Sequence, residues 1–416
     1  MAMDEIKTPL RETRLRVISC VGLILLSIDS LNPVKAICDA LHVESIWIAI
    51  LAFAVLIYNV VENASELIYF STKVFFHSTL SIFFSSMEVI GKQNVPLIGP
   101  VIFTGNHMNQ FVDGAVVLIS NPRKVSFLVA DKSFRTPIIG HLSAAVGAIP
   151  VVRPQDAALK GTGKIMFEGP KIIGQGTKFT QLKSRDRVRP GKYPDGYIIK
   201  QIISDTELIL REEEGLSSLA TLPQLEWMEY DILHYVDQSK MYDTVHSSLA
   251  AGKCLCIFPE GGSHDRTDLL PLKVGIAAIA FGVLEKYGIN IPIIPVGLTY
   301  FRGHRFRGRV VVEFGAPIRI NQEMEDIFRE GRRREAYQTL LSQVGNGMRS
   351  TLVTASNYAE LKLVHTFRRL YQSPSSTITT QQKQDLARRL SISYKILLQR
   401  CKEREREIER EKEIER

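Results

Sequence analysis

A histidine and an aspartate within residues 105–114 are the side chains of this sequence best suited to proton transfer. His107 is the only group in this polar stretch that exchanges a proton near neutral pH, and Asp113 is its only carboxylate. A carboxylate bound to one ring nitrogen fixes the tautomer and makes the other nitrogen a better base. The apolar runs 100–103 and 115–119 flank the stretch and indicate a strand-to-helix junction, where α/β proteins place their chemistry.

The separation of His107 and Asp113 along the chain restricts how they can meet. Six positions on a regular helix correspond to roughly 600° of rotation, so one helix would not place both on the same face. We therefore expect His107 on the turn and Asp113 in the first helical turn, pointing back toward it. A core histidine and an aspartate that stabilises a helix N-terminus would also explain the pair taken alone.

Composition and charge limit the partners of the chain. Its 416 residues suffice for two or three domains, or for one large domain with insertions. The net charge of +8 suits an anionic partner: nucleic acid, a lipid surface or a phosphorylated substrate. Zinc-finger spacing and a regular basic–aromatic stripe are missing from the sequence, so we predict no nucleic-acid binding. The scattered His and Asp residues lack ligand spacing, so we also predict no metal site.

The cysteines indicate the redox compartment. The five cysteines are too few and too scattered for a disulfide framework, which favours a reducing, cytosol-facing compartment. Cys254 and Cys256 would point to one face of a strand, but further ligands for a metal are not apparent near them.

Apolar stretches near the N-terminus predict membrane contact. Residues 45–61 are uncharged, with Trp47 and Tyr58 near the ends, and at about 17 residues they are at the short end of a membrane span. Polar positions interrupt residues 67–89, which favours a helix lying in the membrane interface. A pair of buried helices in a soluble protein is the alternative. Residues 17–28 are too short to span and are interpreted as a shallow membrane helix, a core helix or a signal peptide.

The rest of the chain predicts an α/β fold. We expect strands over 101–103, 125–130, 147–153, 254–259, 290–297 and 309–315, and helices over 115–120, 138–146, 238–251, 273–287 and 322–371. Glycines punctuate a separate β-rich part, in which we expect strands over 164–167, 177–180, 197–203 and 207–210. Two prolines in the run 290–297 indicate an edge strand or a bend. Residues 402–416 alternate in charge and are expected to be a solvated helix or disordered.

These patterns give the expected organisation: a mixed sheet flanked by helices, with an inserted small all-β segment and N-terminal membrane helices. We place the boundaries as follows: membrane-associated helices 1–90, α/β domain 91–160 and 227–320, β insertion 161–226, C-terminal helical region 321–372 and charged tail 373–416.

Three further clusters accompany the His107 stretch. Arg153 ends a short strand that begins after a glycine, and an arginine there can bind a phosphate with two hydrogen bonds. Residues 258–262 follow a buried strand, and their glycines permit close approach of a ligand. A lysine and a proline-containing strand follow them. The candidate residues in these clusters are Gly147, Arg153, Glu260, Gly261, Lys273 and Pro295.

The order of these clusters resembles the four sequence blocks of the glycerolipid acyltransferase superfamily, the phosphate acyltransferases. The matching stretches are 107–113, 147–153, 258–261 and Pro295. The fungal-type glycerol-3-phosphate/dihydroxyacetone-phosphate acyltransferases resemble it most closely, through 109–113, the β segment at 174–180, and later stretches at 311–318 and 368–371. The resemblance covers roughly residues 66–372.

Two departures from the superfamily pattern matter. Five residues separate His107 from Asp113 where the superfamily usually has four, and the fungal-type branch shares the extra residue. Relatives continue into C-terminal membrane helices, whereas this chain ends in a charged run, so we expect the N-terminal segments to anchor it.

The resemblance implies acyl transfer from acyl-CoA, as co-substrate, to a hydroxyl of sn-glycerol 3-phosphate, the first step of glycerophospholipid and triacylglycerol synthesis. It implies no cofactor, and it implies a place at the endoplasmic reticulum membrane with the site facing the cytosol. His107 would be the base and Asp113 would orient it. By the same resemblance, Gly147 and Arg153 would bind the acceptor phosphate, Glu260 and Gly261 would place its hydroxyls, Pro295 would shape the acyl-CoA groove, and Lys273 is a weaker phosphate contact.

Two alternatives remain open. A lysophosphatidate acyltransferase would use the same blocks on a monoacyl acceptor, although the β segment and residues 109–111 favour the glycerol-3-phosphate branch. A membrane scaffold with a degenerate site is the alternative outside enzymes. The intact His107, Asp113, Arg153 and Glu260 argue against such decay.

Overall fold

The structure is a computed structural model that describes residues 45–191, 196–211, 226–301, 305–371 and 378–414. The predictions for residues 17–28, and those that involve Cys20 and Cys38, lie outside these residues. The chain divides into two units, residues 1–73 and 74–416.

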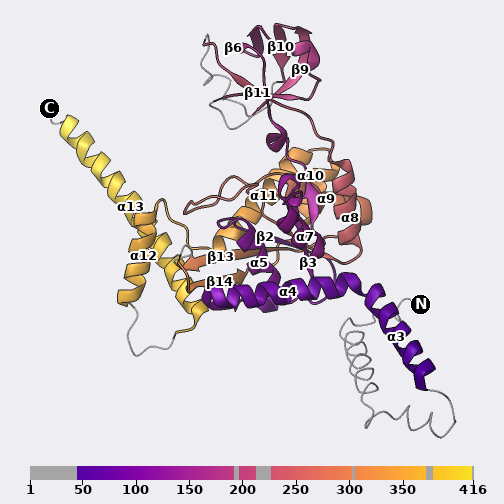
Figure 1. Cartoon of the computed structure of the whole chain (residues 1–416). Helices are drawn as coiled ribbons and strands as arrows, with labels where there is room; N and C mark the ends of the chain where they lie inside the picture. Colours follow the sequence, from indigo (N-terminus) through magenta and orange to yellow (C-terminus); the bar gives the residue numbers. More distant parts are fainter. Residues whose placement is uncertain (1–44, 192–195, 212–225, 302–304, 372–377, 415–416) are drawn as a thin grey trace. The chain divides into compact units, whose positions relative to one another are not determined.

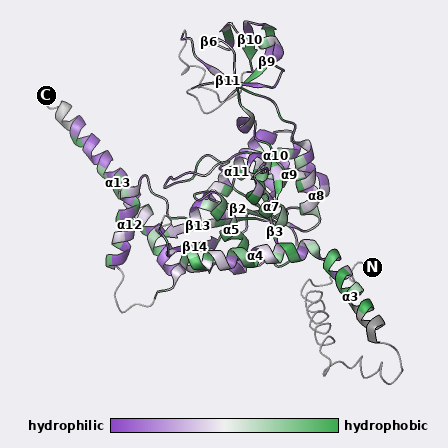
Figure 2. Cartoon of the chain, in the orientation of Figure 1, coloured by the Kyte–Doolittle hydropathy of each residue, from purple (hydrophilic) through white to green (hydrophobic). Residues whose placement is uncertain are grey.

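The described part of the first unit is helical. It contains α3 (Ser45–Glu62) and the first half of α4 (Ala64–Phe83). Figure 2 shows α3 as one of the most hydrophobic elements, and Phe53, Tyr58 and Val61 are exposed on it. Within the described ranges, however, no helix is long and apolar enough to cross a membrane, contrary to the minimal span predicted over residues 45–61.

A seven-stranded mixed sheet forms the centre of the second unit (Figure 1). Its strands, in spatial order, are β1 (Phe84–Ile90), β14 (Gly308–Phe314), β13 (Ile293–Phe301), β2 (Val101–Gly105), β12 (Cys254–Ile257), β3 (Val125–Ala130) and β4 (Ile149–Val151). All neighbours pair in parallel except β13 and β14, which are antiparallel. The predicted α/β fold with a mixed sheet is therefore confirmed.

Helices pack on this sheet because its central strands are apolar on both faces. Ile102, Leu255 and Ile293 are buried in one cluster with side chains of α8 (Ser239–Ala250), α9 (Gly275–Tyr287), α10 (Gln322–Arg329) and α11 (Arg333–Ser350). Phe103, the next residue along β2, points to the opposite face, and its ring lies 5.9 Å from the ring of Phe314. Continuous apolar strands are typical of parallel sheets that are covered on both sides.

Shorter elements complete this part of the chain. α5 (Phe111–Ser120) follows β2, while α6 (Asp131–Phe134) and α7 (Pro137–Ala145) connect β3 to β4. The sequence did not indicate α6. α12 (Tyr358–Tyr371) and α13 (Thr380–Ile414) end the described chain, and a 2.9 Å ion pair between Arg388 and Glu313 joins α13 to β14. The predicted charged tail is helical as far as Ile414.

A second, antiparallel sheet lies in the β-rich part. Its order is β5 (Leu159–Lys160), β11 (Tyr230–Leu233), β8 (Arg187–Pro190), β9 (Tyr197–Ser204), β10 (Glu207–Leu210), β7 (Lys171–Gln175) and β6 (Lys164–Glu168). It has an apolar core of its own, which includes Phe167, Ile172 and Leu208. The strand predicted over 177–180 is wrong, because this stretch forms a loop and a 3-10 turn, Phe179–Gln181.

Two further predictions about local structure are wrong. Residues 67–89 are not one helix, because Phe84 begins β1, which pairs with β14 inside the main sheet. The strand that contains Pro295 is neither an edge nor a bend, because β13 lies between β14 and β2. Proline is tolerated there because β14 ends at Phe314. At that point the sheet needs an acceptor from residue 295 but no donor, and proline has no N–H to donate. The Pro295 carbonyl accepts a hydrogen bond from the Gly315 N–H at 2.8 Å.

Candidate active site

His107 and Asp113 meet in the loop between β2 and α5. β2 ends at Gly105 and α5 begins at Phe111, so His107 lies on the turn and Asp113 in the first helical turn, as the spacing predicts. His107 Nδ1 lies 2.9 Å from Asp113 Oδ2. Because a buried carboxylate accepts hydrogen bonds, Nδ1 carries the hydrogen and Nε2 is left with a free lone pair.

The carboxylate of Asp113 is fully buried and receives four hydrogen bonds. Oδ2 accepts from the backbone N–H groups of Met108 (2.8 Å) and Asn109 (2.7 Å) as well as from His107. Oδ1 accepts from the hydroxyl of Tyr300 at 2.6 Å. These donors compensate the charge that burial would otherwise make costly.

The turn that makes this contact possible contains strained backbone. Gln110, directly before α5, has φ 43° and ψ −118°, a combination that a residue with a β-carbon rarely adopts. Such positions are maintained only where surrounding contacts fix the chain. Here the two N–H groups that bind Asp113 Oδ2 belong to the residues immediately before Gln110.

The histidine loop is held by contacts with β13 and with the residue that follows β12. Asn106 is buried and exchanges two hydrogen bonds with the backbone of Leu298 on β13, at 2.7 and 3.0 Å. The ring of His107 stacks on Phe258, which follows β12, with centroids 4.4 Å apart. The imidazole is therefore fixed by Asp113 at its edge and by an aromatic ring on its face.

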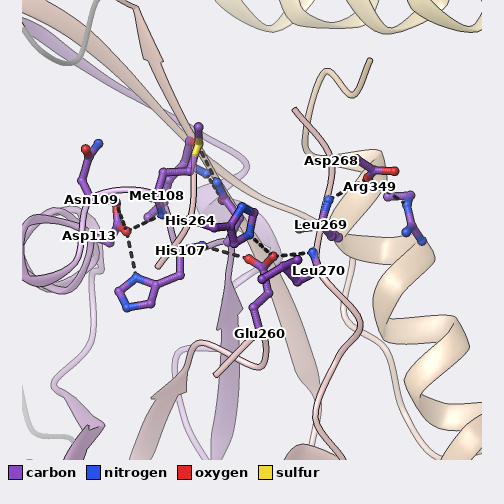
Figure 3. Close-up of polar contacts among 12 residues, drawn as sticks. His107, Met108, Asn109, Asp113, Glu260, His264, Asp268, Leu269, Leu270 and Arg349 are labelled. Carbon is purple, nitrogen blue, oxygen red and sulfur yellow. Dashed lines mark hydrogen bonds and ion pairs between the residues drawn. The ribbon is translucent and has the colours of Figure 1, made fainter. Parts of the chain in front are cut away.

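Glu260 connects the histidine loop to the loop after β12 (Figure 3). Its Oε1 accepts from the backbone N–H of His107 at 3.0 Å, and its Oε2 accepts from the N–H of Leu270 at 2.7 Å. The ring of His264 is a third hydrogen-bond partner. This side chain is fully buried, and its two oxygens bind both loops, so Glu260 holds the loops together. The role that the resemblance implied for it, placing the hydroxyls of the acceptor, stays a prediction.

A cavity of about 630 Å³ opens beside His107. Its wall is mostly apolar and is built largely from α5, β3 and α7, whereas His107, Gln110, Arg153 and residues 261–263 supply polar groups. The apolar lining includes Phe76, Phe111, Leu118, Phe127, Leu128, Ile139, Leu142 and Val146. A space of this kind suits a ligand with a long apolar part and a polar reacting end.

Arg153 lies in the wall of this cavity. Its Nε and Nη2 donate to the two carboxylate oxygens of Asp156, at 2.7 and 3.0 Å, and its Nη1 donates to the carbonyl of Gly261 at 3.0 Å. A guanidinium has five N–H groups, so two remain for an anion. The side chain is about one-third exposed, and it lines the cavity together with His107 and Gly261.

Three other candidate residues do not line the cavity. Gly147 has φ 66° and follows the end of α7, where its N–H donates to the carbonyl of Ala144, so its conformation ends the helix. Lys273 is exposed and precedes α9, outside the helix predicted to contain it. Pro295 is buried in β13 and does not line this cavity, so its contribution to an acyl-CoA groove stays a prediction.

Three residues of the site were not predicted from the sequence: Tyr300, Phe258 as a ring partner, and His264. The strand predicted over 290–297 stopped four residues before the end of β13. Extending the alternation to residues 298 and 300 would have placed Tyr300 on the same sheet edge as His107. Nothing in the local sequence indicates the contact between His264 and Glu260.

Metal ligands are not clustered in the described residues. In the part of the chain that the structure describes, no three His, Cys, Asp or Glu side chains are grouped to hold an ion. Cys254 and Cys256 are buried free thiols on β12, and burial, with Asp113 nearby, raises the pKa of Cys256.

The fold and this site belong with a known class of proteins. The acyltransferase family model matches residues 86–178 and 218–299, which include the histidine loop, Arg153, Glu260 and most of β13. The chain belongs to the acyltransferase family.

Particular relatives can be named. The chain is 38% identical to glycerol-3-phosphate O-acyltransferase 1 of Saccharomyces cerevisiae over 333 residues, which are 77% of this chain and 44% of that protein. Identity to glycerol-3-phosphate O-acyltransferase 2 of the same yeast is 29% (80% and 49%), and identity to an uncharacterized acyltransferase of Schizosaccharomyces pombe is 38% (76% and 48%). The chain thus spans about half the length of the curated relatives it matches.

A solved structure also aligns with the chain. The crystal structure of the 1-acyl-sn-glycerophosphate (LPA) acyltransferase PlsC from Thermotoga maritima matches 68% of this chain and 80% of that one, with 11% identity and a TM-score of 0.35.

Proposed function

We propose that this protein is an acyl-CoA:sn-glycerol-3-phosphate 1-O-acyltransferase that makes lysophosphatidic acid. The observation that carries the proposal is a histidine–aspartate pair at the polar side of an apolar cavity, with Arg153 in the same wall. The printed names of two yeast relatives point to the same acceptor. Dihydroxyacetone phosphate, which has the same phosphate and a free hydroxyl, is a second acceptor that this site would admit.

The proposed reaction uses His107 as general base. Nε2 takes the proton of the acceptor hydroxyl while its oxygen attacks the carbonyl carbon of the acyl-CoA thioester. The carbon–sulfur bond then breaks, and the imidazolium returns the proton to the CoA thiolate, so the enzyme ends as it began. Asp113 stabilises the imidazolium and fixes the ring, and no nucleophile on the enzyme is required.

The two substrates would bind at different ends of the cavity. The apolar wall offers the acyl chain a place out of water, where each buried methylene contributes about 0.8 kcal/mol. The acceptor phosphate would bind Arg153, whose two unused N–H groups suit a phosphate oxygen pair. Gly261, with φ 75°, brings its backbone to the cavity wall, in a conformation that glycine adopts readily. A β-carbon there would lie 3.2 Å from the side chain of Lys273.

We also propose that the protein acts at a membrane, at the cytosolic surface of the endoplasmic reticulum. The support is the set of exposed apolar side chains on α3 and α4, which includes Phe53, Phe70 and Phe75. An interfacial helix buries such side chains among lipid head groups. Vesicle co-sedimentation of the protein with and without residues 45–83 tests this part of the proposal, and equal sedimentation would contradict it.

The test of the activity is product identification with three acceptors. Detergent-solubilised protein is mixed with radiolabelled acyl-CoA and glycerol 3-phosphate, dihydroxyacetone phosphate or lysophosphatidic acid, and the lipid products are separated. We expect monoacyl product from the first acceptor. His107→Ala is expected to lose 10²- to 10⁴-fold in rate while the protein still folds. Near-normal turnover by this variant would refute the role of His107 as base.

The same assay distinguishes the alternatives. Product from lysophosphatidic acid alone would identify a lysophosphatidate acyltransferase, which would use the same histidine. No product from any acceptor, with folded protein, would favour a scaffold with a degenerate site. The complete hydrogen bonding of Asp113 argues against the scaffold, because a buried carboxylate with four donors is a demanding arrangement to retain without use.

A further inference from the structure

Tyr300 is the only donor to the second oxygen of the Asp113 carboxylate among the described hydrogen bonds. Its hydroxyl donates to Oδ1 at 2.6 Å, whereas Oδ2 already receives three donors from the histidine loop itself. Tyr300 belongs to β13, 187 residues further along the chain. This hydrogen bond is therefore the one that ties the catalytic carboxylate to the sheet, not to its own loop.

The tyrosine is itself held in place. Its ring lies 6.0 Å from the ring of Phe84 on β1. Tyr300 is therefore held between β1 and the carboxylate to which it donates.

We propose that Tyr300 is a positioning residue, which acts through Asp113 to fix the carboxylate and to limit the basicity of His107. The inference deepens the proposed function and rests on it. A hydroxyl that donates to Oδ1 draws negative charge away from the oxygen that faces the imidazole. The imidazolium is then stabilised less, and the free base is retained to lower pH.

The state of the hydroxyl fits this role. Burial, with the neighbouring charge of Asp113, raises the pKa of Tyr300 well above its usual value, so the group stays a donor throughout an ordinary assay range. The other titratable groups that face the pair are Glu260, which binds the N–H of His107, and Cys256 of β12. Burial raises the pKa of the Cys256 thiol, which therefore stays neutral in the same range.

The experiment is a pair of opposed substitutions at Tyr300. Tyr300→Phe removes the donor, and replacement by 3-fluorotyrosine gives a stronger donor of nearly the same size. For Tyr300→Phe we expect kcat to fall about tenfold, because the carboxylate loses a hydrogen bond that fixes its position. Loss of one hydrogen bond to a charged group has an effect of about this magnitude. The acid limb of the kcat/KM pH profile should move to higher pH by roughly half to one unit, with little change in KM. For the protein with 3-fluorotyrosine at position 300, the acid limb should move to lower pH.

Tyr358→Phe is the matched control. Tyr358 also donates its hydroxyl to a carboxylate, that of Asp265, but at an exposed position on α12. We expect its pH profile to coincide with that of the unmodified protein. Thermal unfolding of each variant shows whether a loss of rate comes from loss of fold.

The outcomes separate this inference from the proposed function. If His107→Ala abolishes transfer while Tyr300→Phe and the fluorinated protein keep the original acid limb, the inference is overturned and the function stands. If His107→Ala retains transfer, the proposed base is wrong and the inference falls with it. If Tyr300→Phe does not fold, the limb of the fluorinated protein decides alone, and an unmoved limb overturns the inference.

Discussion

Asp113→Asn is the substitution that most directly tests the paired side chains. Asparagine has the same shape but offers one acceptor oxygen and an NH₂ group in place of two oxygens. Three donors converge on the position of Oδ2, so the asparagine oxygen should occupy it and keep those hydrogen bonds. The NH₂ group then faces Tyr300, whose hydroxyl can rotate to accept. The variant should therefore fold, with the loop in place but without the charge.

The magnitude follows from the geometry. Nδ1 and Oδ2 are 2.9 Å apart, which places the two charge centres about 4 Å from each other. At an effective dielectric constant near 20, such a pair interacts by about 4 kcal/mol. That interaction exists only when the imidazole has taken the proton, so its loss should lower kcat by roughly a thousandfold. The acid limb of the pH profile should move to lower pH, because the imidazolium has lost its partner.

The assay follows release of the CoA thiol or of radiolabelled lipid product at saturating acyl-CoA. Asp186→Asn is the matched control, because Asp186 is also buried, binds a histidine (His234 Nδ1, 3.0 Å) and accepts two backbone N–H groups. It lies directly before β8 of the antiparallel sheet and does not line the cavity beside His107. We expect Asp186→Asn to lose stability but to retain its turnover at a temperature where it is folded.

A rate for Asp113→Asn within tenfold of the unmodified protein would refute this reasoning. So would a large loss of rate with an unmoved acid limb, because the charge would then have no influence on the proton carried by His107. An equal loss in Asp186→Asn would show that the assay reports folding and not catalysis.

Three other predictions follow from the same structure. Arg153→Ala should raise the KM for glycerol 3-phosphate at least tenfold and leave that for acyl-CoA nearly unchanged, as initial rates would show; Arg153→Lys should recover part of the loss. A β-carbon at Gly114 would lie 3.8 Å from Phe127 in the cavity, so Gly114→Leu should lower kcat/KM for long acyl-CoA about tenfold more than for short acyl-CoA, whereas Gly114→Ala should not. Burial and two neighbouring arginines lower the pKa of His365 to about 4. Because this lies below the unfolded value of about 6.5, stability should fall between pH 6.5 and 4, and His365→Phe should reduce that fall in melting temperature.

The parts of the fold that the sequence predicted are those with strong local patterns. β3 and β10 have the predicted bounds because each is a short apolar run between turn residues. The turn that brings His107 to Asp113 was predictable because only six positions separate them. Local spacing alone excludes a shared helix face and leaves one arrangement.

Contacts between distant parts of the chain were not predictable in the same way. Glu260 binds the N–H of a residue 153 positions away, and a sequence pattern does not show which carboxylate a backbone N–H will meet. The hydrogen bonds by which Glu260 joins the two loops were therefore not predictable, although the residue itself was assigned to the site. The strand that contains Pro295 was wrongly predicted to be an edge or a bend for a related reason. An internal strand tolerates proline only where the neighbouring strand ends, and the end of β14 is not visible in the sequence around Pro295.

The strained conformation of Gln110 has a consequence for the engineering of heat-resistant variants. Backbone in such a conformation costs of the order of 1–3 kcal/mol, and glycine adopts it without that cost. Gln110→Gly would relieve the strain but would also free the loop in the unfolded chain, so the two effects oppose each other. The same position lines the cavity beside His107, so a substitution there that raises the melting temperature would also change the cavity.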